Sequence, residues 1–380
     1  MKLPFYHSHQ SGRNRPRGTP VFLCGLNPAD RWLAGSVLLL SLFGVVMVYE
    51  SSVAIAVRDF SDQFYFIREQ LKWLALGLTG LFIGSKLSYR IWHMLAVPFF
   101  FATIALLLMV FLPGLGIRAQ GAHRWLNFGF FVFQPAEFAK FTTVLYLSAW
   151  LRNSESNRFS AFVIYLCMTV GLILLEPDMG TSFVLLLIAI SMYFFSGEPI
   201  RHLFIFIPIM AIVIIGLAII SPYRLSRVMT FLNLQEDPLG ASYQIRQVLV
   251  ALGSGGWTGV GIGKSRQKYE YLPEANTDSI FAIIAEELGF VGSVCVILVY
   301  MVIIWRCFKI SIRAPDNFGR LFALGAGIWI ACQTIVNLSA MVALIPLTGI
   351  PLPFVSYGGS SLIIALTAVG IVLNISTYKS

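Results

Sequence analysis

The chain has few charged side chains for its length, and this shortage excludes an ordinary water-soluble fold. Charged residues make up 12% of the 380 residues, whereas hydrophobic residues make up 57%. Soluble domains carry about 25% charged residues. The formal net charge is +9, but basic and aromatic residues do not interleave as they do on nucleic-acid-binding surfaces, so we expect no nucleic-acid partner. The composition predicts a protein that crosses a membrane several times.

Cysteine and histidine are also scarce, with five residues of each type. None of the cysteines falls in a predicted outer loop, so no external disulfide is expected. The sequence has neither a His/Cys zinc signature nor an Asp-x-Asp pattern. A divalent cation, Mg²⁺ or Mn²⁺, is the one cofactor left open, and its ligands stay unassigned.

Long apolar runs take up most of the remaining sequence. A membrane-spanning helix needs about 20 apolar residues, and the runs lack the period-two alternation that is typical of membrane barrels. We predict an all-α polytopic membrane protein with ten transmembrane helices, which form a single domain over residues 31–380. The predicted segments are 32–49, 71–83, 91–112, 135–151, 161–175, 181–195, 203–221, 280–305, 321–345 and 360–376.

Basic residues near the helix ends predict the orientation of the chain. With the N-terminus inside, the inner segments hold most of the Lys and Arg residues, and the short outer loops hold few. Those in the outer loops are Arg58, Arg68, Lys72, Arg118 and Arg124. Because positive charge favours the cytoplasmic side, we expect both termini in the cytoplasm and residues 222–279 outside, as a large loop between helices seven and eight. Residues 1–30 are basic and lack a signal-peptide pattern, so we interpret them as a cytoplasmic tail.

The large outer loop is polar and rich in glycine, and long polar loops of this kind often carry function. It holds a strip of alternating basic residues, Lys264, Arg266 and Lys268. Arg224 and Arg246 lie on the same side of the membrane. Lys and Arg side chains neutralise lipid phosphates and pyrophosphates. We therefore treat all five as candidate substrate-binding residues.

Two carboxylates follow this strip. Glu274 and Asp278 lie four residues apart, so a helix that began at Pro273 would place both on one face. Neighbouring like charges and partial burial raise the pKa of a carboxyl group toward the range of a general base. Asp278 also precedes an apolar run, where Asp is a common helix cap. Catalysis and capping both remain open at this position. Glu274 is a candidate substrate-binding residue.

Further polar residues occur on the outer side of the predicted bundle. Arg124 lies in a short outer loop, and Glu176, Pro177 and Asp178 interrupt two apolar runs. Arg124 and Asp178 are candidate substrate contacts. For Asp178, a helix-capping role is at least as good an interpretation.

Two opposite charges fall inside the fourth apolar run. Glu137 and Lys140 lie three residues apart, hence on one helix face. Either charge alone would cost several kcal/mol in the hydrocarbon. We expect them to pair with each other or with another helix, and either to stabilise the bundle or to guide a polar headgroup or a proton.

Four groups of motifs resemble those of the SEDS family, the bacterial shape, elongation, division and sporulation proteins. They are GAHRWLNFG with QPAEFAK (121–140), EPDMGTS (176–182), YLPEANTDSIFAIIAEELG (271–289) and PLTGIPLPFVSYGGSSL (346–362). The essential aspartate of the family falls on Asp278, and Glu274 matches the motif glutamate. The chain has Asn276 and Ser279 where His and Phe are usual, and Glu176 where Gln is common. The GKSRQK run and the basic tail are more similar to the division and sporulation members, whereas PLTGIPLPFVSYGG also fits the elongation member RodA.

The resemblance implies a ten-helix peptidoglycan glycosyltransferase of the bacterial cytoplasmic membrane. Such an enzyme polymerises lipid II onto a lipid-linked glycan strand, and it works with a class B penicillin-binding transpeptidase and with divisome or elongasome proteins. One carboxylate base suffices for an inverting transfer with polyprenyl pyrophosphate as the leaving group. Two alternatives stay open: a flippase for a lipid-linked precursor, and a noncatalytic scaffold.

Overall fold

The computed structural model of the chain describes residues 28–119, 122–129, 131–153, 158–199, 201–202, 204, 208, 216, 242–269 and 272–378. Most of the expected cytoplasmic tail lies outside the described residues. The same holds for most of the predicted seventh helix and for the first part of the large loop. The predictions for these segments therefore remain predictions.

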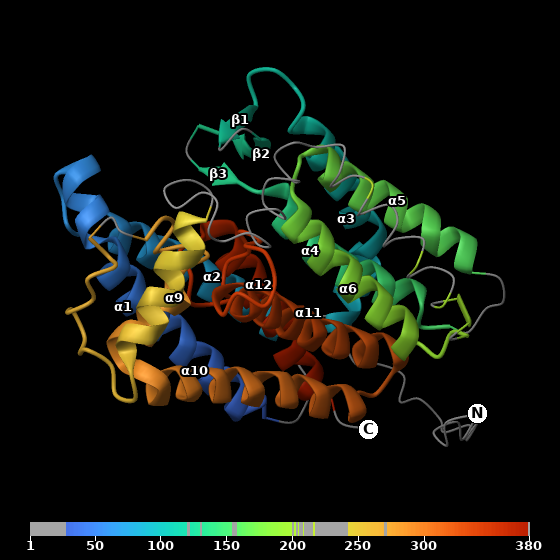
Figure 1. Ribbon diagram of the computed structural model, residues 1–380. Coiled ribbons are helices and arrows are strands. Elements are labelled where there is room, and N and C mark those ends of the chain that lie inside the picture. Colours follow the sequence, from blue (N-terminus) through green and yellow to red (C-terminus); the bar gives the residue numbers. More distant parts are fainter. Residues whose placement is uncertain are drawn as a thin grey trace.

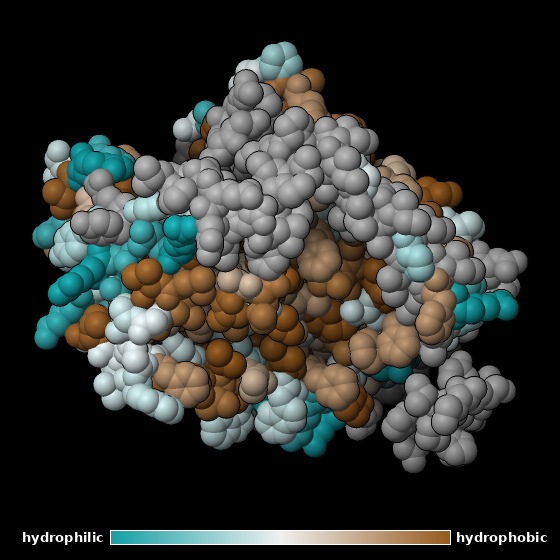
Figure 2. Space-filling model, viewed as in Figure 1, coloured by the Kyte–Doolittle hydropathy of each residue, from teal (hydrophilic) through white to brown (hydrophobic). Residues whose placement is uncertain are grey.

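Every other predicted spanning segment is a helix. Five helices are long and apolar enough to cross a membrane, namely α1, α3, α10, α11 and α12, and α5 and α6 are shorter apolar helices. Figure 1 shows the helices packed side by side, and Figure 2 shows hydrophobic side chains gathered in the middle of the visible face. The helices are α1 Arg31–Phe60, α2 Tyr65–Lys86, α3 Tyr89–Met109, α4 Pro135–Trp150, α5 Phe159–Leu175, α6 Met179–Phe195, α10 Ile280–Ile312, α11 Asn317–Met341 and α12 Gly359–Ser376.

The second helix, Tyr65–Lys86, is longer than its predicted apolar run, and it packs closely on α12 along a row of glycines. Gly77, Gly80 and Gly84 face α12, and a Cβ added at Gly84 would lie only 2.9 Å from the carbonyl oxygen of Thr367. Small residues at such spacings let membrane helices approach closely. This close packing holds α2 in the bundle, although α2 carries several charged residues.

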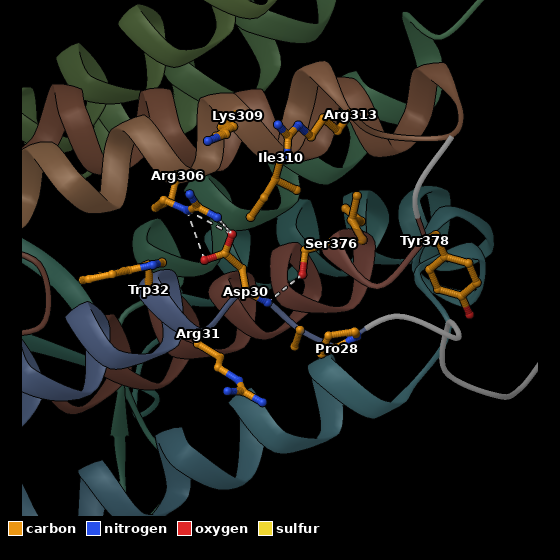
Figure 3. Close-up of a pocket in the computed structure, with 12 residues that line it drawn as sticks. Pro28, Asp30, Arg31, Trp32, Arg306, Lys309, Ile310, Arg313, Ser376 and Tyr378 are labelled. Atoms are coloured by element: carbon orange, nitrogen blue, oxygen red, sulfur yellow. Dashed lines mark hydrogen bonds and ion pairs between the residues drawn. The ribbon is translucent and has the colours of Figure 1, made fainter.

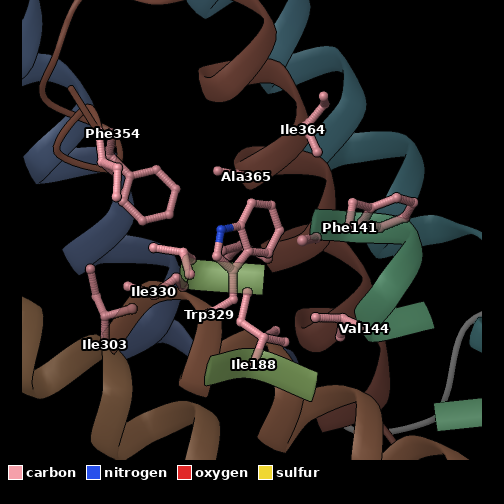
Figure 4. Close-up of a cluster of buried hydrophobic side chains, with 14 of the residues drawn as sticks. Phe141, Val144, Ile188, Ile303, Trp329, Ile330, Phe354, Ile364 and Ala365 are labelled. Carbon is pink, nitrogen blue, oxygen red and sulfur yellow. The ribbon is translucent and has the colours of Figure 1, made fainter. Parts of the chain in front are cut away.

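The core of the bundle lies where α4, α6, α11 and α12 meet. Trp329 of α11 is 2% exposed and lies among Phe141, Val144 and Ile188 in Figure 4. These side chains belong to one buried hydrophobic cluster. The cluster fixes the helices that carry the polar residues described below.

The connection between α3 and α4 corrects the expectation of a purely helical chain. It forms a small antiparallel sheet of β1 Gly116–Ala119, β2 Ala122–Asn127 and β3 Val132–Phe133. Figure 1 shows the three strands together beyond the ends of α3 and α4. At that position the strands need not meet the hydrocarbon, where an open sheet edge is excluded.

Helix α10 is broken at Gly289, where the backbone is not helical (φ 68°, ψ −166°). The turn after α9 (Tyr243–Gly255) fills the break. The backbone N–H groups of Val260 and Gly261 donate to the carbonyls of Glu286 and Glu287, at 3.0 and 3.1 Å. The two N–H groups that follow Gly289 donate back to carbonyls of the same turn. The backbone carbonyls before the break and the N–H groups after it are thus hydrogen-bonded within the protein.

Candidate active site

Asp278 lies immediately before α10 and is nearly buried, at 8% exposed. The amide Nδ2 of Asn337, on α11, donates to the carbonyl oxygens of Asp278 and Ile350, both at 2.8 Å. The hydroxyl of Ser279 donates to Oδ1 of Asp278 at 3.4 Å, and it accepts from Gln244 of α9 at 3.1 Å. The position of Asp278 is therefore fixed by α9, by α11 and by the α11–α12 connection.

Glu274 belongs to the same turn but not to a helix, so the shared helical face predicted for the two carboxylates is wrong. Its backbone is left-handed (φ 52°), and its carbonyl accepts from the N–H groups of Thr277 and Ser279. Its side chain is exposed and accepts from the hydroxyl of Thr277 at 2.7 Å. The capping alternative for Asp278 is not observed either, because the residue before α10 is Ser279 and it makes no side-chain cap.

The three residues of the basic strip do not form one surface. Lys264 and Arg266 are exposed. Lys268 is buried, and its ammonium group lies 2.9 Å from Oε2 of Glu50 and 3.4 Å from Oε1 of Glu287. Burial alone would lower the pKa of Lys268, but the hydrogen bond to Glu50 and the charge of Glu287 raise it above its ordinary value. The expected substrate contact of Lys268 is thus replaced by an internal ion pair.

A second carboxylate of α10 fixes the same part of the loop. Glu286 is 2% exposed and accepts from the hydroxyl of Ser265 and, at 3.0 Å, from the backbone N–H of Arg266. Sequence reasoning missed Glu50, Glu286 and Glu287. For the last two a signal existed, because adjacent carboxylates within an apolar run need partners.

Arg124 reaches the turn between α5 and α6. Its guanidinium group donates to the carbonyl oxygens of Glu176 at 3.3 Å and Pro177 at 2.5 Å. Asp178 caps α6, because its side chain accepts from the backbone N–H of Thr181 at 3.0 Å and from its hydroxyl at 2.9 Å. The capping interpretation of Asp178 is therefore confirmed. Arg124 is hydrogen-bonded to the α5–α6 turn, to which Asp178 belongs.

Glu176 in this turn is fully buried, and neither of its carboxyl oxygens has a hydrogen-bond partner in the described part of the chain. Burial, reinforced by the nearby charge of Asp178 and opposed by that of Arg124, raises the pKa of Glu176 to about 9. The group is therefore protonated and neutral at pH 7.

The start of α6, directly after this α5–α6 turn, also contacts the α11–α12 connection, which helps to hold Asp278 in place. A Cβ added at Gly180 would lie 2.4 Å from the carbonyl oxygen of Thr348 and 2.9 Å from Ile350. Tyr357, farther along the same connection, donates its N–H to the carbonyl of Asn276 at 2.8 Å. The motifs 176–182, 271–289 and 346–362 thus meet near Asp278.

The intramembrane charges form the expected pair. Nζ of Lys140 lies 2.6 Å from Oε1 of Glu137, and the side chains are 1% and 2% exposed. Lys140 also donates to Gln333 at 2.8 Å, and the amide of Gln333 donates to the carbonyl of Pro351 at 2.8 Å. The pair is therefore linked to the connection that Asn337 holds. Gln333 and Asn337 were missed, although two amides four residues apart in an apolar helix mark one polar face.

The remaining predicted contacts are only partly described. Arg246 lies on α9 and is half-buried. Arg224 lies outside the described residues. Across the part of the chain that the structure describes, no group of three or more His, Cys, Asp and Glu side chains suits a metal ion.

Comparison with known proteins identifies the family of the chain. A family model for cell cycle proteins, which covers FtsW, RodA and SpoVE, matches residues 31–380. The chain belongs to this family. The match confirms the resemblance to SEDS proteins.

Individual members of the family are similar over nearly their whole length. A probable peptidoglycan glycosyltransferase FtsW of Trichlorobacter lovleyi is 39% identical over 348 residues, which cover 90% of this chain and 91% of the relative. Stage V sporulation protein E of Bacillus subtilis is 39% identical over 357 residues, which cover 90% and 95%.

Solved structures of the family agree with the fold. One chain, from a study of polymerization and crosslinking by a peptidoglycan synthase complex, superposes with a TM-score of 0.75 at 30% identity and covers 92% of this chain and 97% of its own length. The rod shape determining protein RodA of Thermus thermophilus superposes with a TM-score of 0.68 at 30% identity and covers 92% and 96%. The polytopic helical fold is therefore shared with the family.

Proposed function

We infer that the chain is a peptidoglycan glycosyltransferase that polymerises lipid II at the outer face of the bacterial cytoplasmic membrane. Membership of the family, with relatives named as probable peptidoglycan glycosyltransferases, supports this activity. The observation that carries the assignment of the site is the position of Asp278. Its carboxylate is nearly buried while its backbone is fixed by Asn337, and a general base requires such a fixed position.

Asp278 acts as the general base. Its carboxylate accepts the proton of the acceptor sugar 4-hydroxyl while that oxygen bonds to the anomeric carbon of the donor. The bond from this carbon to the pyrophosphate breaks, and polyprenyl pyrophosphate leaves with the bonding electrons. Attack from the opposite face inverts the α-linked donor to a β-linked product, as in inverting glycosidases.

Basic residues of the outer loop stabilise the leaving pyrophosphate. Lys264 and Arg266 are exposed, so they can meet an anionic headgroup, and Arg224 and Arg246 belong to the same loop. Charge-assisted hydrogen bonds from Lys and Arg stabilise the charge that develops on phosphate oxygens. A divalent cation would supply the same kind of stabilisation. Lys268, whose ammonium group is already paired, supports the loop instead.

The orientation and the partner belong to the same proposal. Both termini lie in the cytoplasm, and residues 222–279 lie outside, where the lipid-linked substrate is displayed. The partner is a class B penicillin-binding transpeptidase within a divisome or elongasome. The similarity to a chain from a peptidoglycan synthase complex supports this arrangement, and the division and sporulation relatives favour a role in division.

The test is glycan-strand formation from lipid II by the purified protein with its cognate transpeptidase. Asp278→Asn keeps the size of the side chain but cannot accept the proton, so polymerisation should fall at least about a hundredfold. Glu274→Gln is the matched control, because Glu274 is exposed and contacts its own turn, and its effect should be milder.

The same variants separate the alternatives. Normal polymerisation by folded Asp278→Asn would overturn the assignment of the base. If headgroup translocation, assayed in parallel, occurs while the wild type makes no glycan, the flippase is favoured. A wild-type protein that binds the transpeptidase but has neither activity would be a scaffold.

A further inference from the structure

A cavity of about 290 Å³ lies at the end of the bundle opposite to the outer loop. It is formed by the start of α1 and the ends of α10 and α12. Figure 3 shows Arg306, Lys309 and Arg313 on the α10 side, Arg31 on the α1 side and Tyr378 at the end of α12. Its volume is near the low end for small-molecule sites, which range from about 300 to 1,000 Å³. The glycosyl transfer proposed above makes no use of it.

The wall of the cavity is strongly basic. Arg31, Arg306, Lys309 and Arg313 all line it, whereas Asp30 is the one acidic residue among the lining side chains. Asp30 is already occupied, because its carboxylate binds Arg306, with Nε to Oδ2 at 2.9 Å, and accepts from the N–H of Leu33 at 3.0 Å. Three lining cations, Arg31, Lys309 and Arg313, therefore have no carboxylate of the lining to balance them.

The basic residues of α10 border a surface that suits lipid chains. Trp305, Phe308 and Ile312 share a neighbouring face of the same helix, and they are 55%, 47% and 68% exposed. Nζ of Lys309 lies 4.8 Å from the ring centroid of Trp305. Exposed tryptophan next to basic side chains is typical of the headgroup level of a bilayer. The basic lining of the cavity thus borders an exposed apolar face of α10, as the headgroup of a phospholipid borders its acyl chains.

We propose that this cavity binds the phosphate headgroup of an anionic phospholipid, such as phosphatidylglycerol, from the leaflet at this end of the bundle. The phosphate lies among Arg31, Lys309 and Arg313, and the acyl chains extend along the exposed face of α10. Lys and Arg bind phosphate through charge-assisted hydrogen bonds. Basic pockets between helix ends are a recurrent form of lipid recognition in membrane proteins. In the orientation proposed above, the lipid comes from the inner leaflet.

Lipid retention by the purified full-length protein tests this proposal. Native mass spectrometry would count phosphatidylglycerol and phosphatidylcholine retained from an equimolar mixture. Lys309→Gln with Arg313→Gln removes two cavity cations but leaves the Asp30–Arg306 pair. A hydrogen bond to a charged phosphate contributes roughly a tenfold preference, so the preference for phosphatidylglycerol should fall about 100-fold.

Two further variants control for charge and for folding. Lys86→Gln with Arg320→Gln removes two exposed cations at the same end of the bundle, away from the cavity lining, and should keep the wild-type preference within about twofold. Lys309→Arg with Arg313→Lys keeps the charge and should retain the lipid. Equal losses in the cavity pair and the control pair would overturn the proposal.

A final arm distinguishes a membrane lipid from a soluble phosphate. Millimolar inorganic phosphate should not displace phosphatidylglycerol, because it cannot use the apolar face of α10. Displacement by inorganic phosphate at the concentration at which short-chain phosphatidylglycerol displaces it would overturn the lipid assignment. Absence of any preference in the wild-type protein would do the same.

Discussion

Replacing Lys268 by Met should destabilise the outer loop more than any other change of a single charge in the basic strip. The substitution keeps a long aliphatic side chain and removes the ammonium group. Glu287 then loses its ion-pair partner while its side chain is 0% exposed, whereas Glu50, at 17%, is reached by water more easily. The carbonyl of Gly263 also loses a donor at 2.8 Å.

The magnitude follows from burial. Removing one partner of a buried pair typically costs about 3 to 5 kcal/mol, because the other charge stays uncompensated. Lys264→Met is the matched control. Lys264 is exposed, so its replacement should change stability by less than about 0.5 kcal/mol.

A double-mutant cycle provides the assay. Thermal unfolding in detergent and limited proteolysis of the loop would be measured for Lys268→Met, for Glu287→Gln and for the double variant. Because Glu287→Gln removes the stranded charge, it should recover more than about 1 kcal/mol of the loss. Strictly additive effects, or equal effects of Lys268→Met and Lys264→Met, would refute the reasoning.

Three other predictions follow from the described contacts. Glu176 has a pKa raised to about 9 from an ordinary 4.5, so its contribution to stability is complete below pH 4.5 and is lost as the pH rises to about 9. Between pH 5 and 9 the free energy of unfolding should fall by about 1.4 kcal/mol per pH unit more in the wild type than in Glu176→Gln. Equal pH dependence of the two proteins would contradict the prediction. Glu137→Ala and Lys140→Ala should each cost about 3 to 5 kcal/mol, but the double variant should cost less than their sum, and additivity in unfolding assays counts against coupling. Cysteines at Ser254 and Lys86, in a background without native cysteines, should react from opposite sides of the membrane in cells; labelling from one side excludes the proposed topology.

Much of the fold could be predicted from the apolar runs, because burial in lipid requires helices wherever a run is long enough. The run after Ser279 predicted the start of α10 at Ile280. The break at Gly289 could not be predicted, because the run continues through it and the partners of the broken backbone lie in the turn after α9. Helix periodicity does not reveal such tertiary hydrogen bonds.

The site was predictable where its partners are close in sequence. The Glu137–Lys140 pair and the Asp178 cap join residues three positions apart, so spacing alone was sufficient. Lys268 pairs with Glu50, which lies 218 positions away, and spacing carries no information at that separation. The strip therefore looked uniform in sequence, although one of its residues is buried.

The amides of α11 fix the proposed site through main-chain carbonyls and add no charge to it. Asn337 holds Asp278 through its main-chain carbonyl, so this contact adds no charge beside the carboxylate, where a cation would lower the carboxylate pKa. Gln333, one turn earlier, accepts from Lys140 and donates to Pro351, which separates the buried charge from the site by a neutral group. A charged residue in place of Asn337 would position the same carbonyl but would shift the proton affinity of Asp278. A neutral amide at this position therefore satisfies the geometry and the chemistry together.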